Sequence, residues 1–126
     1  MPARSPALDA TGVVTALSPA FPLVWHSEQL RGTGTALVVV AGELDRVTSP
    51  ALRDHLEWWL SQGCERVVLD AADVTFADSA AFDALGAIGT RATDLRCRVE
   101  LMPAGAALGR LIALAGRPPG VHVAAA

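Results

Sequence analysis

The sequence is poor in charged residues, and it contains neither a basic stripe nor a long apolar run. Charged residues make up 18% of the chain, and 10 basic residues against 13 acidic ones leave a formal net charge of -3 with a pI near 5.5. Nucleic-acid partners select a basic surface, so this balance argues against them. No apolar stretch approaches the about 18 consecutive residues that a membrane-spanning helix needs. We therefore predict a soluble, cytoplasmic protein with no nucleic-acid or membrane partner, and expect a protein or small-molecule partner.

Cysteine and histidine are scarce as well. The two cysteines, Cys64 and Cys97, stand at or near the starts of strand-like segments, where a buried free thiol serves as a small apolar side chain. They could also pair, but free thiols are the favoured interpretation for a cytoplasmic chain. The three histidines, His26, His55 and His122, lie far apart without the spacing of metal ligands. We predict no metal site and no cofactor.

Apolar residues are plentiful: they make up 52% of the 126 residues, and the mean hydropathy is +0.38. This composition suits one domain with one continuous core. Residues 1–20 are rich in Ala, Pro, Ser and Thr without clean periodicity, so we predict a flexible tail there. Prolines at positions 19 and 22 interrupt any secretory apolar segment, in keeping with the cytoplasm. We assign residues 21–126 to the domain.

Strand-like and helix-like patterns alternate along this domain. Residues 36–41 form a continuous apolar run, which predicts a strand covered on both faces, with helices on both sides of the sheet or at least over this strand. Thr48 and Ser49 before Pro50 predict a helix start, because Ser or Thr can cap and proline is tolerated at the first helical position. The alternation predicts an α/β fold with a mixed sheet of four to five strands and packed helices. The predicted strands are 36–41, 66–70 and 95–101, with an edge strand at 22–26 and a short final strand at 121–123. Residues 74–76 follow the strand 66–70 after a short loop, and the predicted helices are 48–63, 78–93 and 103–115.

Two acidic motifs follow neighbouring predicted strands. Gly42-Glu43-Leu44-Asp45 ends the strand 36–41, and Asp78-Ser79 stands between an apolar run and an alanine-rich helix. Because the carboxyl ends of strands in an α/β sheet share one edge, Asp45 and Ser79 are expected to be neighbours. The Ser79 hydroxyl lies at a predicted helix N-terminus, where backbone N–H groups and the helix dipole can receive a phosphate. Taken alone, Thr48 and Asp78 would be helix caps.

From about residue 22 to residue 123 the chain resembles the STAS domain family, and in particular the bacterial anti-sigma factor antagonists. The resemblance lies in three motifs in family-like order: Gly42-Glu43-Leu44-Asp45-Arg46-Val47-Thr48, Val67-Val68-Leu69-Asp70 and Phe76-Ala77-Asp78-Ser79. It implies a single STAS-like domain without enzymatic activity or catalytic residues, which binds an anti-sigma factor and so frees the sigma factor.

The resemblance also implies partners and site residues. The partner is an anti-sigma factor that is a serine kinase; it phosphorylates Ser79 and switches the antagonist off, and a PP2C-type phosphatase resets the cycle. Asp45 lies beside the serine in the partner surface. We predict Asp45, Thr48, Asp78 and Ser79 as the partner-binding set.

Two alternatives stay open. Typical family members continue after the serine with Ser or Thr, then Gly, then an aliphatic residue, whereas this chain reads Ala80-Ala81-Phe82. A STAS scaffold that binds its partner without phosphoregulation would fit this departure. An enzymatic alternative groups Asp70, Asp73 and Asp78 around Mg²⁺ for phosphoryl chemistry, but neither a basic residue nor a phosphate-cradling glycine loop accompanies them.

Overall fold

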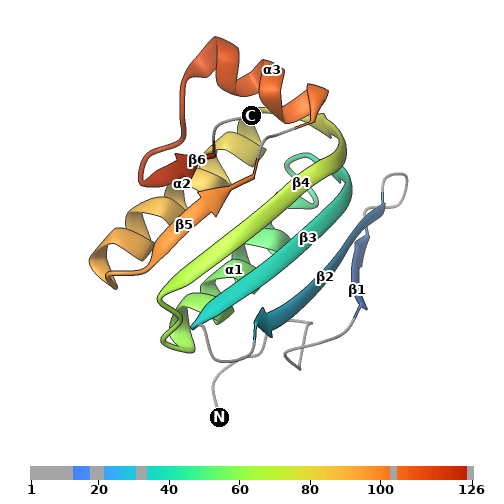
Figure 1. Cartoon of the computed structure of the whole chain (residues 1–126). Helices are drawn as coiled ribbons and strands as arrows, with labels where there is room; N and C mark the ends of the chain where they lie inside the picture. The colour runs from blue at the N-terminus through green and yellow to red at the C-terminus, as the bar shows by residue number, and fades with distance from the viewer. Residues whose placement is uncertain (1–12, 18–21, 31–33, 103–104, 125–126) are drawn as a thin grey trace.

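The core of the fold is a mixed sheet, shown in a computed structural model that describes residues 13–17, 22–30, 34–102 and 105–124 (Figure 1). In these residues the sheet has six strands, and their order in the sheet follows the chain from β1 to β6. The pairs β1–β2 and β2–β3 are antiparallel, and the three remaining pairs are parallel. The strands are β1 (Val13–Leu17), β2 (Pro22–Leu30), β3 (Thr35–Leu44), β4 (Arg66–Ala77), β5 (Arg98–Leu101) and β6 (Val121–Val123).

The predicted α/β class is confirmed. The sheet has six strands in the described residues, where four to five were expected. The additional strand is β1, which lies within the predicted tail of residues 1–20 and pairs with β2 from Val13–His26 to Leu17–Pro22. A short edge strand has only one neighbour, so its sequence carries a weak pattern. The start of the domain at residue 21 stays a prediction.

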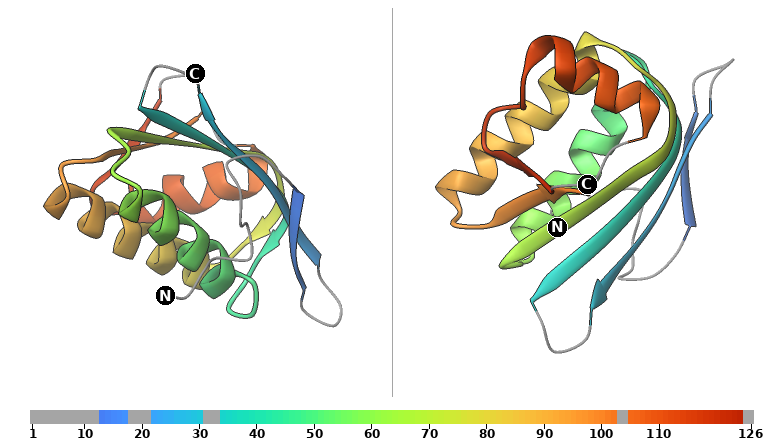
Figure 2. Two further views of the ribbon diagram at one scale, coloured as in Figure 1. Left: turned by 90° about the horizontal axis from the view of Figure 1, so that it is seen from below. Right: turned by 45° about the horizontal axis from the view of Figure 1, so that its top comes forward.

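Two helices cover one face of the sheet (Figures 1 and 2). They are α1 (Ser49–Ser61) and α2 (Ser79–Asp94), whereas α3 (Ala106–Ala115) lies at the carboxyl end of the sheet against β4. None of the described helices is long and apolar enough to cross a membrane. The core between helices and sheet includes many side chains that are at most 1% exposed, among them Trp25, Val38, Leu56, Trp59, Leu69, Leu85, Ile88 and Leu101.

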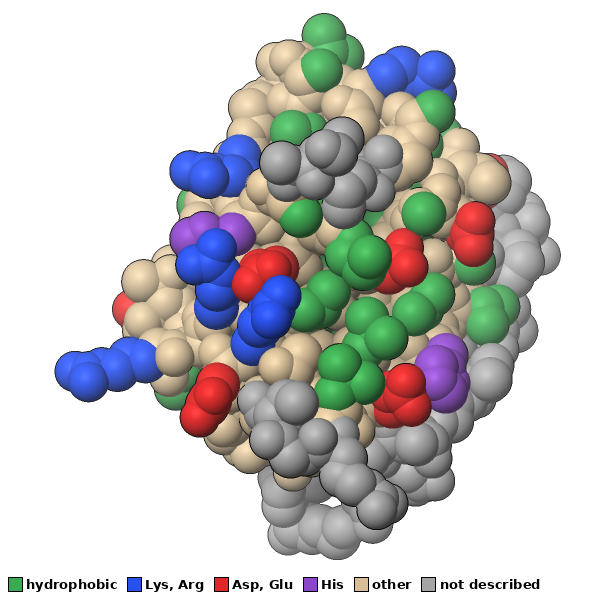
Figure 3. Space-filling model, viewed as in Figure 1, with side chains coloured by type: hydrophobic (Ala, Val, Ile, Leu, Met, Phe, Trp, Pro, Cys, Tyr) green, Lys and Arg blue, Asp and Glu red, His purple; other side chains and the backbone are tan. Residues whose placement is uncertain are grey.

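The prediction that both faces of β3 are covered is wrong. Val38 and Val40 point to the helices and are fully buried, but Leu37 and Val39 on the opposite side are only half-buried. No described helix packs across the centre of that second face, the open face, where Figure 3 shows apolar side chains gathered. The continuous apolar run of β3 therefore reflects an open sheet face that is itself apolar. The length of such a run does not tell whether helices cover the second face of the strand.

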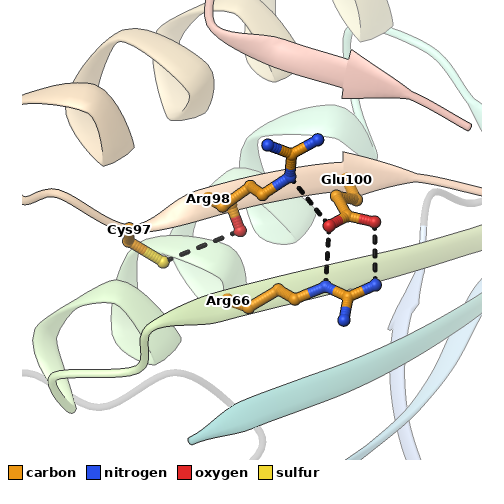
Figure 4. Close-up of polar contacts among 4 residues, drawn as sticks. All are labelled: Arg66, Cys97, Arg98 and Glu100. Carbon is orange, nitrogen blue, oxygen red and sulfur yellow. Dashed lines mark hydrogen bonds and ion pairs between the residues drawn. The ribbon is translucent and has the colours of Figure 1, made fainter.

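Charged side chains border the open face along β5. Glu100 Oε1 lies 2.7 Å from Nε of Arg66 and 2.8 Å from Nε of Arg98, so its carboxylate sits between two guanidinium groups (Figure 4). Hydrogen bonding by Arg66, with a smaller contribution from Arg98, lowers the pKa of Glu100. Because the arginine side chains are 47% and 56% exposed, we expect this cluster to add little to stability.

The loop predicted after Asp70 is absent, because β4 runs without a break through it. β4 shifts register against β3 there: Val39 pairs with Asp70, but Ala41 pairs with Asp73, so β4 holds one residue more than β3 in this interval. Such a bulge bends a strand without ending it. The alanines and aspartates at the bulge are residue types that are depleted in strands, which is why the sequence predicts a loop there.

Two further boundaries differ from the prediction. The strand expected from residue 95 begins at Arg98, because Leu95 is the C-cap of α2 and Arg96 adopts a φ of 57°. The helix expected from residue 103 begins at Ala106 after Gly105, and residue 103 lies outside the described residues. Cys64 and Cys97 are buried free thiols, as predicted.

Candidate functional site

The carboxyl ends of β3 and β4 lie side by side and bring the two acidic motifs together. Leu44 pairs with Ala77, the last residues of both strands, and the N–H of Asp78 donates to the carbonyl of Leu44 at 3.2 Å. Asp45 and Asp78 therefore leave neighbouring strands at one edge, and Ser79 follows directly. We call Asp45, Asp78 and Ser79 the strand-end surface.

The turn after β3 holds the Asp45 carboxylate in place. Its Oδ1 accepts hydrogen bonds from the backbone N–H groups of Val47 at 2.8 Å and of Thr48 at 2.9 Å. These bonds, above all the one from Thr48, lower the pKa of Asp45, while partial burial acts in the opposite direction. None of the described residues donates a hydrogen bond to Oδ2. One oxygen thus fixes the turn, and the other remains available to a donor from a partner.

Thr48 builds this turn instead of capping α1. Its hydroxyl donates to the carbonyl of Glu43 at 2.6 Å and accepts the N–H of Asp45 at 3.0 Å. Although Thr48 occupies the N-cap position, its side chain makes no capping hydrogen bond, so the expectation of a cap is wrong. Thr48 is 1% exposed, and its place in the fold is to hold Asp45.

Asp78 caps α2, and Ser79 is the first residue of that helix. The extended backbone of Asp78 lets its Oδ1 accept the N–H of Ala80 at 2.9 Å. Ser79 is exposed, and its hydroxyl has no hydrogen bond to any described residue. An exposed hydroxyl at a helix N-terminus is accessible to a kinase, and the positive end of the helix dipole favours a phosphate there.

The residues after Ser79 adopt a helical backbone that does not require glycine. The N–H groups of Ala81 and Phe82 donate to the carbonyl of Asp78 at 3.1 and 3.3 Å, and Ala81 is 1% exposed against the core. Among the described residues other than glycine, only Arg96 has a positive φ. Alanine at position 81 therefore causes no backbone strain, and half-buried Phe82 forms part of the surface next to Ser79.

Two large apolar residues beside the strand-end surface were not predicted. Val47, in the turn after β3, is 53% exposed, and Phe76, which pairs with Glu43 near the end of β4, is 45% exposed. Exposed apolar side chains grouped near polar ones are typical of contact surfaces. In the sequence, Phe76 stands in an apolar run that is typical of buried residues. Its exposure follows from its place near the end of β4, which the sequence pattern does not show.

The three aspartates of the enzymatic alternative are not brought together. Asp70 and Asp73 pair with β3 inside β4, whereas Asp78 caps α2 beyond the end of the strand. The Oδ1 atom of Asp70 also accepts the N–H of Ala72 at 3.1 Å. Within the part of the chain that the structure describes, no three His, Cys, Asp or Glu side chains are grouped to hold a metal ion.

Comparisons with known proteins agree with this architecture. A family model described as Mlab, STAS domain matches residues 28–117, and the chain therefore belongs to the STAS domain family. A solved structure, an anti-sigma factor antagonist from Mycobacterium paratuberculosis, is similar with a TM-score of 0.67 and 25% sequence identity, over 79% of this chain and 85% of that one. No curated protein matches the sequence. The resemblance seen in the motifs is thus confirmed.

Proposed function

We propose that this protein is a cytoplasmic anti-sigma factor antagonist that works as a phosphorylation switch. In its unmodified form it binds an anti-sigma factor, itself a serine kinase, through the strand-end surface and so frees the sigma factor. The similarity to a solved antagonist supports this class of function. The observation that carries the switch is the exposed Ser79 hydroxyl, at the N-terminus of α2 and beside the edge where Asp45 is held.

Apolar and acidic groups together would form the contact. Val47 and Phe76 supply exposed apolar area beside the serine, and Asp45 and Asp78 offer carboxylate oxygens to donors of the partner. Thr48 contributes indirectly, because its hydroxyl keeps the Asp45 turn in shape.

Phosphorylation transfers the γ-phosphoryl group of ATP to Oγ of Ser79. The new O–P bond forms, the bond to ADP breaks, and the hydroxyl proton passes to a base of the kinase. The product carries about -1.5 to -2 charges. The helix N-terminus stabilises this charge by about 0.3–1 kcal/mol, while the carboxylates of Asp45 and Asp78 oppose it. In a complex the phosphate would lose hydration next to these carboxylates. Each loss of about 1.4 kcal/mol in binding free energy weakens binding tenfold. A PP2C-type phosphatase would hydrolyse the ester and restore binding.

Phosphate transfer in vitro tests the assignment. Incubation with the cognate anti-sigma kinase and Mg-ATP is expected to add one phosphate, detected by intact-mass spectrometry, and Ser79→Ala is expected to abolish the addition. The matched control is Ser61→Ala, which changes an exposed serine at the end of α1 and should behave as wild type. Continued phosphate incorporation into Ser79→Ala would disprove Ser79 as the acceptor.

A constitutive scaffold is the second candidate, because Ala80 lacks the second hydroxyl that typical family members have after the serine. The affinity of the anti-sigma partner for wild type and for Ser79→Asp separates the two. A loss of at least about tenfold in the variant supports the switch. Equal affinities would support the scaffold instead.

A further inference from the structure

A groove runs along α2 on the same side of the helix as Ser79. Its volume is about 370 Å³, and it is lined by Phe82, Asp83, Gly86, Ala87, Thr90 and Pro119. At 3.6 residues per turn, the five lining residues that belong to α2 lie within about 80° of Ser79 around the helix axis. The fully buried Leu85 and Ile88 lie on the opposite side, against the sheet. The groove and the phosphoacceptor therefore share one face of α2.

A close approach of two backbone segments shapes this groove. Gly86 has no side chain, and a Cβ atom placed there would lie 3.0 Å from Cδ of Pro119. The segment that leads into β6 therefore passes beside α2, as Figure 2 shows, and its proline forms one wall. Half-buried Phe82 lines the end of the groove nearest to Ser79. The small side chain of Ala87 leaves space in the middle of the groove. The floor and walls are mainly apolar and suit an apolar side chain.

The one charged side chain among the described residues that line the groove is acidic. Asp83 is exposed, and no described residue forms an ion pair with it. Asp78 stands at the start of the same helix, and Asp45 adds a third carboxylate across the strand ends. None of the described lining residues is basic. The neighbouring Arg91 is engaged by Glu57 at 2.9 Å. A partner that presents a basic group here would be complementary in charge.

We infer that this groove receives an apolar side chain from an amphipathic segment of the anti-sigma partner, with a basic residue of that segment opposite Asp83. The inference rests on the proposed function and assigns the partner a docking site next to the switch. Phe82 and Asp83 lie about one helical turn, 5.4 Å along the axis, from Ser79. A segment seated in the groove thus passes the acceptor hydroxyl, and a phosphate on Ser79 meets that same segment. The groove contributes binding affinity, and phosphorylation of Ser79 prevents the partner segment from occupying the groove.

Filling the groove tests this docking site. Ala87→Trp places a large ring in the groove, and it is expected to weaken calorimetric binding of the anti-sigma partner at least about tenfold, the effect typical of an occupied central pocket. Phosphorylation of Ser79 should slow at low kinase concentration and recover at saturating kinase, because the acceptor itself is intact. Ala113→Trp, at an exposed position of α3, is the matched control and should bind as wild type. Circular dichroism and thermal melting of the free variants verify their fold.

A charge reversal tests the same site independently and keeps the test decisive if Ala87→Trp fails to fold. Asp83→Arg is expected to weaken binding most at low salt, and the difference from wild type should shrink as salt screens the charges. Asp94→Arg, at an exposed acid at the far end of α2, is its control. If both groove variants bind as wild type while wild type is phosphorylated on Ser79, the groove inference is overturned and the proposed function stands. If wild type neither binds nor accepts phosphate, both fall.

Discussion

His55 shows how this fold keeps a buried titratable side chain neutral. The residue is fully buried, and its ring stacks on that of Trp25 with a centroid distance of 5.2 Å. Its Nε2 accepts the indole N–H of Trp59 at 3.2 Å and lies 3.0 Å from the hydroxyl of Ser27. The indole N–H can only donate, so Nε2 carries a lone pair and the ring proton is assigned to Nδ1. Burial lowers the pKa of His55 to about 4.

Folding stability is therefore expected to fall as the pH drops from about 6.5 to about 4. Over this window the unfolded chain binds a proton on His55 and the folded protein does not, which favours unfolding by up to about 3 kcal/mol. Urea titrations across the window measure the slope. The lowered pKa values of Asp45 and Glu100 act at the acidic end of this range: the stability they contribute is present above the ordinary values of 3.8 and 4.5 and is lost as the pH falls below them.

Two variants identify the group responsible. His55→Phe removes the titration and the hydrogen bonds, so it should be less stable at neutral pH but nearly insensitive to pH across the window. His122→Gln, which changes an exposed histidine of β6, should keep the wild-type slope. An undiminished slope in His55→Phe would assign the dependence to another group.

Helix α2 meets the segment before β6 through backbone contacts that only glycine allows. A Cβ atom on Gly89 would lie 2.0 Å from the carbonyl oxygen of Pro119, and one on Gly120 would lie 2.3 Å from the carbonyl oxygen of Gly89. Gly120 also has a φ of 71°. The contact joins α2 to the last strand of the sheet, and it sets the wall of the α2 groove.

Gly89→Ala is consequently expected to destabilise the protein, although alanine is the better helix former. The gain from helix propensity is about 1 kcal/mol, but the clash with rigid backbone should reverse it to a net loss of about 1–3 kcal/mol. Gly86→Ala is the graded control, because its nearest neighbour is a ring carbon of Pro119 at 3.0 Å, and a smaller change is expected. Chemical denaturation compares the two. A more stable Gly89→Ala would show that the contact relaxes freely.

The same contact explains which elements could be predicted from the sequence. Helical spacing in α2 and the apolar run of β3 are local patterns, and the two acidic motifs meet because β3 and β4 are neighbours with one helix between them. The approach of Pro119 to Gly89 joins residues 30 positions apart and has no local signal. The bulge of β4 and the exposure of Phe76 also depend on the partner strand, so propensity and periodicity do not reveal them.

Across the whole molecule, the proposed phosphoacceptor is separate from the core. Ser79 is exposed at the first position of α2, whereas Ala81 and Leu85 on the opposite side of that helix are buried against the sheet. A change at Ser79 therefore acts on a surface and leaves the packing of the helix untouched. Under the proposed function, this separation would allow release of a partner without a change of fold.

The phosphorylated protein is accordingly expected to keep its fold while losing its partner. The helix dipole and the nearby carboxylates act on the phosphate in opposite senses, so its net effect on the free energy of unfolding should stay within about 1 kcal/mol, a shift in Tm of a few degrees. Thermal melting and hydrogen exchange of α2 measure this, with mock-treated Ser79→Ala as the control. Loss of amide protection from Ala81 to Ile88 on phosphorylation would instead show that the modification melts the helix. Release would then be conformational, and the electrostatic account of the strand-end surface would be wrong.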